Sequence, residues 1–124
     1  MRRVLIVLSL TLLLACAPRV QSGGLEPMVT ERLYFGRNIA NALGVTDSAW
    51  AVFVRDIVST RLPSGFTFWP AEGQWREPSF ILEVVHLPRQ AQADSAIVAI
   101  IAEYKRRFGQ ESVLRVVTVG RGTF

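Results

Sequence analysis

Few side chains in this sequence combine a reactive type with a suggestive position. Cys16 is the only cysteine and His86 the only histidine. The thiol follows the apolar run "LIVLSLTLLLAC", and the imidazole lies near the end of "FILEVVHL". A thiolate is a nucleophile and a metal ligand, and imidazole ordinarily titrates near neutral pH. These two residues are therefore the first candidates for function.

His86 has two interpretations. Strand alternation places it on one face with Phe80, Leu82 and Val84, and places Glu83 on the other face. The apolar neighbours favour a core or helix-capping histidine, and a catalytic acid or base is the alternative. The sequence contains no nucleophile elbow, no phosphate loop and no cluster of metal-ligand residues. We therefore predict no cofactor and no metal.

Further candidates for a ligand site or an interface lie outside these apolar runs. Trp75 and Arg76 fall in a connection, where exposed aromatic residues often mark binding. The alternative for Trp75 is that it covers one end of the core. Tyr34, Glu83 and Arg115 complete the candidate set, because the sheet described below brings them together.

The environment of Cys16 predicts an anchor. Two arginines and a short apolar run precede it, and this run is too short to span a bilayer, which takes about 20 apolar residues. Leu13-Leu14-Ala15-Cys16 resembles the bacterial lipobox, which implies cleavage after Ala15 and acylation of Cys16. An ordinary secretory signal and a buried thiol are the alternatives. We predict a signal peptide over 1–15 and a lipid-anchored tether over 16–30.

A Cys16→Ser variant tests the anchor. The substitution removes the thiol that would carry the lipid, so we expect the protein to leave the membrane fraction or to accumulate as the uncleaved precursor. Fractionation followed by intact-mass measurement distinguishes these two results. A fully processed Cys16→Ser protein that partitions into membranes like the wild type would refute the prediction.

Length and charge limit the number of domains and the kinds of partner that the rest of the chain can have. The 124 residues allow one domain, and the formal net charge is +4, or +2 once Arg2 and Arg3 are removed with the leader. No basic run is interleaved with aromatic residues. This balance does not indicate nucleic-acid binding.

Periodicity predicts the elements that position the candidates. Alternating or aromatic runs indicate strands, and apolar residues at helical spacing, such as Trp50, Phe53 and Ile57, indicate helices. The predicted strands are 32–39, 66–71, 80–87 and 112–119, and the predicted helices are 46–60 and 92–108. The order βαββαβ is typical of an α+β, ferredoxin-like sandwich over 31–124, with both helices on one face of a four-stranded antiparallel sheet.

The other sheet face is predicted to be open. In this topology the first strand lies between the third and fourth, so Tyr34 would lie between Glu83 and Arg115. Alternation places four valines on the same face, namely Val85, Val113, Val117 and Val119. A half-apolar face is unusual for a surface in water, so we predict that a second copy of the domain covers it, and a bound hydrophobic ligand is the alternative.

Four stretches resemble a known family: "LYFGRNI" (33–39), "GQWR" (73–76), "VVH" (84–86) and "YKRRFGQESVLRV" (104–116). Over about 31–124 the chain is similar to the bacterial family called domain of unknown function 3574. The resemblance supports the domain boundary and implies no reaction, substrate or cofactor.

Two functions follow from these observations. The preferred one is a lipid-anchored, non-enzymatic binding or interaction module of the bacterial cell envelope, facing the periplasm or the cell exterior. It rests on the predicted tether and on the absence of an evident catalytic set. The alternative is a small enzyme of the dimeric α+β-barrel kind that acts on a small molecule near His86, with Tyr34 and Arg115 around it.

Overall fold

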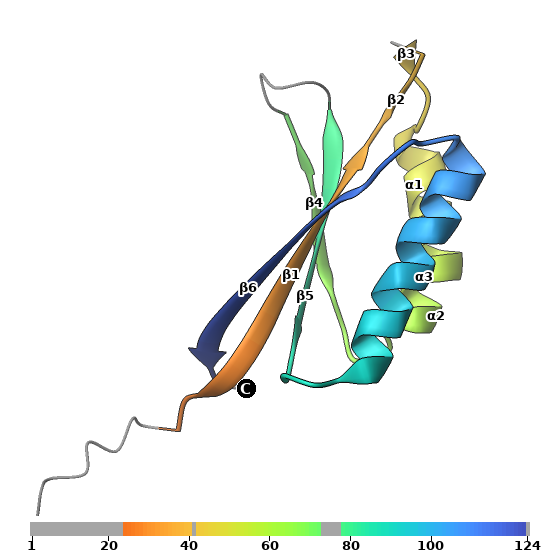
Figure 1. Cartoon of the computed structure of the whole chain (residues 1–124). Coiled ribbons are helices and arrows are strands. Elements are labelled where there is room, and N and C mark those ends of the chain that lie inside the picture. The colour runs from red at the N-terminus through yellow and green to blue at the C-terminus, as the bar shows by residue number, and fades with distance from the viewer. Residues whose placement is uncertain (1–23, 41, 73–77, 124) are drawn as a thin grey trace, which may run out of the picture.

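A computed structural model describes residues 24–40, 42–72 and 78–123. They form an antiparallel sheet with strand order β4-β5-β1-β6, and a small separate hairpin. Both long helical segments lie on one side of the sheet (Figure 1). The elements in chain order are β1 (Glu26–Gly36), β2 (Asn38–Ile39), β3 (Ala42–Leu43), α1 (Asp47–Phe53), η1 (Val54–Val58), α2 (Ser59–Arg61), β4 (Thr67–Ala71), β5 (Ser79–His86), α3 (Ala91–Phe108) and β6 (Leu114–Gly122).

The predicted βαββαβ order is confirmed, with β1 between β5 and β6. The strand boundaries differ at both ends of the domain. β1 begins at Glu26, within the segment predicted as the tether, and β6 continues to Gly122. Residues 26–30 pair with 118–122 of β6. The hydrogen bonds of β6 extend β1 over residues whose side chains show no strand pattern of their own.

The first helical segment begins as predicted. The Thr46 side chain accepts a hydrogen bond from the Ala49 N–H at 3.2 Å, as an N-cap does. Between α1 and α2 the helix widens into one π-helical stretch, η1. Trp50 and Phe53 before this stretch and Val58 at its end are all buried, so the whole segment presents one apolar face to the sheet.

The second helix, α3, ends where glycine permits a left-handed residue. Gly109 has φ of 61°, and its N–H bonds to the Lys105 carbonyl oxygen. Ile97, Ile100 and Tyr104 of α3 are fully buried. The Tyr104 hydroxyl donates to the Gly36 carbonyl oxygen at 2.8 Å, which ties the helix to the end of β1.

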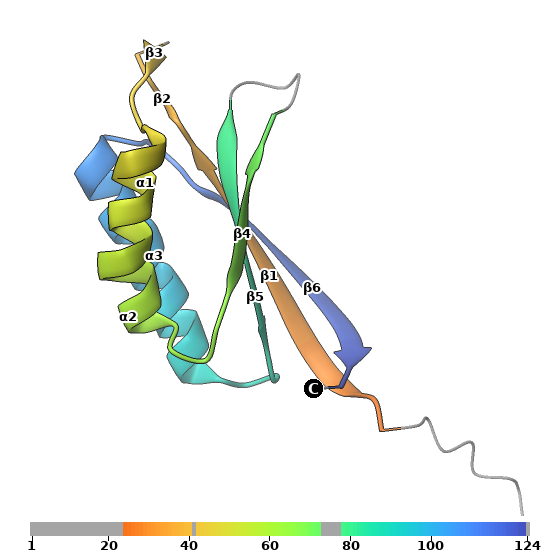
Figure 2. The same cartoon turned by 180° about the vertical axis from the view of Figure 1, so that it is seen from behind.

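The core between the helices and the sheet is rich in aromatic rings. The Trp50 ring stacks on Phe80 with centroids 4.4 Å apart and planes within 8° of parallel. Phe35 contacts Trp50, Phe53 and Tyr104 edge-on or tilted. Seen from both sides, β1 and β6 run on beyond the part of the sheet that the helices cover (Figures 1 and 2). The candidate functional site lies beside this uncovered end of the sheet.

Candidate functional site

Four ionisable side chains meet where β5 ends and α3 begins. His86 Nε2 lies 3.1 Å from Glu31 Oε1. Arg115 donates to both oxygens of Glu31, from Nε to Oε2 at 2.5 Å and from Nη2 to Oε1 at 2.9 Å. Arg115 Nη2 also donates to Asp94 Oδ1 at 2.6 Å. We call Glu31, His86, Asp94 and Arg115 the polar cluster.

Strand register explains why these residues meet. Glu31 points to the helices with Leu33 and Phe35, because side chains two apart on a strand share a face. His86 is opposite Val29, and Arg115 is opposite Leu33. Opposed residues of antiparallel strands point to the same side, so His86 and Arg115 reach Glu31 diagonally from the two neighbouring strands. Asp94 joins them from the first turn of α3.

The polar cluster is closed at Glu31 and open at Asp94. The Glu31 side chain is 3% exposed and the His86 side chain 10%, whereas Arg115 is 25% exposed and Asp94 61%. A buried carboxylate is stable only when it is paired, and Arg115 supplies that pair. Solvent and small solutes therefore approach the polar cluster from the Asp94 side.

Both ring nitrogens of His86 face oxygen atoms. Nδ1 lies 2.8 Å from the Leu87 carbonyl oxygen, which can only accept, so Nδ1 carries a proton. Nε2 faces a carboxylate oxygen of Glu31. The arrangement therefore places an imidazole nitrogen within hydrogen-bond reach of a buried carboxylate.

The electrostatics of the polar cluster favour ionised partners. Burial by itself would raise the pKa of Glu31, but the hydrogen bonds from Arg115 and His86 outweigh burial and hold that pKa below its usual value. The hydrogen bond to Glu31, opposed in part by burial, raises the pKa of Arg115, and the bond to Asp94 adds to the increase. Glu31 and Arg115 therefore form a charged pair inside the fold.

Arg115 is not on the open sheet face, so the predicted group of Tyr34, Glu83 and Arg115 is wrong. Glu83 is on that face, where it pairs with Arg32 at 2.5 Å. Tyr34 lies opposite Ile81 and Leu114 there. The error arose because β6 is apolar on both faces, so its alternation does not reveal which face meets the helices.

The predicted valine patch is corrected for the same reason. Val85 is on the open face, but Val117 and Val119 are on the helix-facing side, opposite Glu31 and Val29. Val113 packs against the core. The apolar residues of β6 on the open face are Leu114 and Val116. A homodimer through the open face stays an untested prediction, now on a different set of side chains.

Three predicted residues lie outside the described residues: Cys16, Trp75 and Arg76. Lipidation of Cys16, and the envelope location that it would imply, stay predictions.

Sequence reasoning missed Glu31 and Asp94. A usable signal existed for Glu31, since it precedes Leu33 and Phe35 by two and four residues and so continues their inward-facing alternation. No comparable signal identified Asp94, because its role depends on where the start of α3 lies relative to β6.

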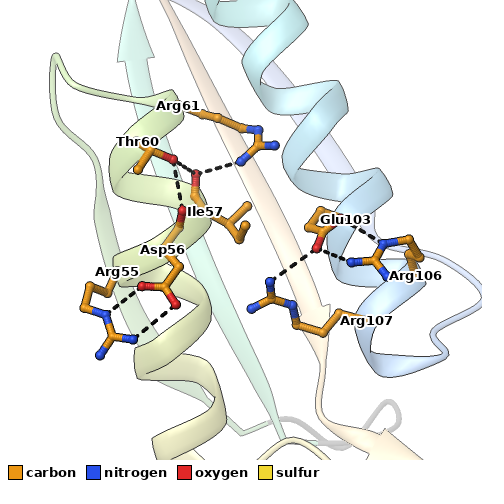
Figure 3. A network of polar contacts seen from close by, with 8 residues as sticks. All are labelled: Arg55, Asp56, Ile57, Thr60, Arg61, Glu103, Arg106 and Arg107. Atoms are coloured by element: carbon orange, nitrogen blue, oxygen red, sulfur yellow. Dashed lines mark hydrogen bonds and ion pairs between the residues drawn. The ribbon is translucent and has the colours of Figure 1, made fainter.

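A second polar network covers the helical layer and is shown in Figure 3. Glu103 accepts hydrogen bonds from Arg106 and Arg107, and Arg55 pairs with Asp56. The hydrogen bonds from Arg106 and Arg55 hold the pKa values of Glu103 and Asp56, respectively, below their usual range. Arg55 and Arg106 are each 70% exposed, so this network is a solvated surface rather than a candidate site.

The described residues contain neither a metal-binding cluster nor a membrane-spanning helix. Across 24–40, 42–72 and 78–123, no group of three or more His, Cys, Asp or Glu residues is arranged to hold a metal ion. In the same part of the chain, no helix has both the length and the hydropathy needed to cross a membrane.

The topology defines a ferredoxin-like α+β domain, and solved structures share this fold. A phage SAM lyase in complex with S-methyl-5'-thioadenosine has a TM-score of 0.52 at 18% identity, covering 78% of this chain and 90% of its own. A PII-like signaling protein from Thermus thermophilus has a TM-score of 0.46 at 18% identity, covering 80% and 91%. The chain belongs to the family described as "Protein of unknown function (DUF3574)", matched over residues 30–124. None of the curated proteins compared with the chain matches it.

These findings overturn the preferred prediction of a non-enzymatic binding module, whereas the lipid anchor that formed part of it stays untested. In the phage SAM lyase the same fold is that of an enzyme. The prediction had also been made without the polar cluster, because Glu31 had been overlooked and Arg115 had been assigned to the opposite face. The alternative, an enzyme acting on a small molecule near His86, agrees better with the findings.

Proposed function

We propose that the domain is a small enzyme that binds an adenosyl-sulfur compound beside His86 and moves a proton at the Glu31–His86 pair. The observation that carries the proposal is the 3.1 Å contact between His86 Nε2 and Glu31 Oε1, which places an imidazole beside a buried carboxylate. A general acid or base must be positioned within hydrogen-bond reach of its partner, and this pair meets that condition.

The choice of substrate class has two supports. The phage enzyme of the same fold is named as a SAM lyase and holds S-methyl-5'-thioadenosine, which supplies the first compounds to try. The second support is Asp94, whose carboxylate is 61% exposed at the open side of the polar cluster. A sulfonium cation such as SAM would be attracted to the carboxylate that is more exposed, Asp94.

The test is conversion of SAM by the full chain, with His86→Asn as the variant. Removal of a positioned acid or base is expected to lower kcat by about 10²–10⁴-fold. Product is followed as S-methyl-5'-thioadenosine by liquid chromatography, and the folded fraction of each protein is measured by thermal unfolding. A kcat per folded molecule that is the same in both proteins would make the polar cluster purely structural and refute the proposal.

Binding is measured independently of turnover. Because His86 is the only histidine, its two ring C–H signals in a proton NMR spectrum need no assignment by mutation. Titration with S-methyl-5'-thioadenosine is expected to shift them in a saturable way. A wild-type protein that neither converts SAM nor shows such a shift would contradict the proposal.

A further inference from the structure

Three valines continue the sheet face that carries the polar cluster. Val117 lies opposite Glu31, Val119 lies opposite Val29, and Val29 lies opposite His86. Opposed side chains of antiparallel strands point to the same side, with Cβ atoms about 5 Å apart. We call Val29, Val117 and Val119 the valine shelf. Val117 lies beside Glu31, Val29 lies beside His86, and Val119 lies beside Val29.

The two β6 members of the valine shelf are exposed, unlike the residues of this face that lie under the helices. Leu33, Phe35 and Leu82 on the same side of the sheet are fully buried under the helices. Val117 is 54% exposed and Val119 74%, because β1 and β6 extend past the helical layer (Figures 1 and 2). An apolar wall beside a few convergent polar groups is the usual composition of a small-molecule site.

We propose that the valine shelf is the wall on which the apolar ring of the bound small molecule lies. The polar end of the molecule then faces Arg115 and Asp94, which are the exposed members of the polar cluster. The inference rests on the proposed function and makes it more specific: the ligand is amphipathic, with a planar apolar part next to a charged or hydroxyl-bearing part. Contact with Val117 brings the ring beside Glu31, which is opposite Val117.

A small molecule fits the valine shelf better than a second protein chain does. A stable protein interface takes about 20–30 residues on each side. The shelf has only three residues, far fewer than such an interface needs. An aromatic ring can cover three adjacent valine side chains. Along β6 a single residue separates Val117 of the shelf from Arg115 of the polar cluster.

The test replaces Val117 and Val119 by Thr together. Threonine keeps the β-branched shape that suits a strand and exchanges a methyl group for a hydroxyl. Loss of apolar contact with the ring is expected to raise the Kd of S-methyl-5'-thioadenosine about tenfold. This is the smallest effect usually seen when one methylene group is lost from a hydrophobic pocket. Val116→Thr is the matched control, because Val116 is on the same strand, is 40% exposed and points to the opposite face. It should leave Kd unchanged.

The His86 ring signals separate failure of this inference from failure of the proposed function. If the nucleoside shifts them in the wild type while the Val117→Thr and Val119→Thr double variant binds equally well, the shelf is not the wall and the proposed function stands. If the nucleoside shifts them in no protein and the wild type does not convert SAM, both are wrong. A wild-type dimer that the double variant converts to a monomer would assign the shelf to a second copy, and would overturn the inference.

Discussion

The Glu31→Gln variant is expected to be less stable than the wild type by about 3 kcal/mol at pH 7, since breaking a buried charged pair leaves the other charge without compensation. Glu31 is 3% exposed and bonds to both Arg115 and His86. Glu83→Gln is the matched control, because Glu83 also pairs with an arginine, Arg32, but at the surface. It should leave the free energy of unfolding nearly unchanged.

The pH dependence of the same variant has a definite sign. The folded-state pKa of Glu31 is held below its ordinary value of 4.5, so the carboxylate stabilises the fold fully above about that pH. This contribution is lost as the pH falls through the lower, folded-state pKa, and Glu31→Gln lacks it at every pH. We therefore expect the free energies of unfolding of the wild type and of Glu31→Gln, measured in urea between pH 7 and pH 3, to converge in acid. Equal losses in Glu31→Gln and Glu83→Gln at pH 7 would contradict the charged pair.

The second large effect is expected in the core. Trp50→Ala should lower the free energy of unfolding by about 3–5 kcal/mol, the usual cost of removing a large buried aromatic side chain. Trp50 is 2% exposed, stacks on Phe80 and contacts Tyr104 edge-on. The free energy of unfolding of a small domain is only about 5–15 kcal/mol, so this single change would remove a large share of the stability.

Two variants serve as controls for Trp50→Ala. Trp50→Phe keeps an aromatic ring against Phe80 and removes the indole N–H, which is buried and has no hydrogen-bond partner among the described residues. It should cost less than Trp50→Ala, since an unsatisfied buried donor is itself unfavourable. Trp69→Ala truncates a half-buried tryptophan on the other sheet face. A Trp50→Ala loss no larger than that of Trp69→Ala would contradict the packing described.

Most of the architecture was predictable because each element carries a local signal. The helix that begins after Thr46 has an N-cap and a continuous apolar stripe, and α3 ends at a glycine. The interior of β1 alternates cleanly at Leu33 and Phe35. These signals depend only on neighbouring residues, so the sequence carries them without reference to the rest of the fold.

The site was predicted only in part, since its geometry depends on contacts between distant segments. His86 was identified with the correct face, but Arg115 was not. Leu114 and Val116 are as apolar as Val117 and Val119, so only the pairing with β1 decides which pair faces the helices. Asp94 joins the polar cluster through tertiary structure alone. In the fold, the π-helical stretch η1 likewise has no sequence signature that we recognise.

The central position of β1 limits the speed and order of folding. The first strand of the domain is completed by the last, and Glu31 and Arg115 are 84 residues apart in the chain. Contacts between such distant residues form late and are associated with slow folding, because the entropy of closing a long loop is lost before the contact forms. During synthesis β1 leaves the ribosome first and cannot pair with β6 until the end of the domain has emerged. Until then the unpaired edge of β1 is exposed to other chains, and such edges are prone to aggregation.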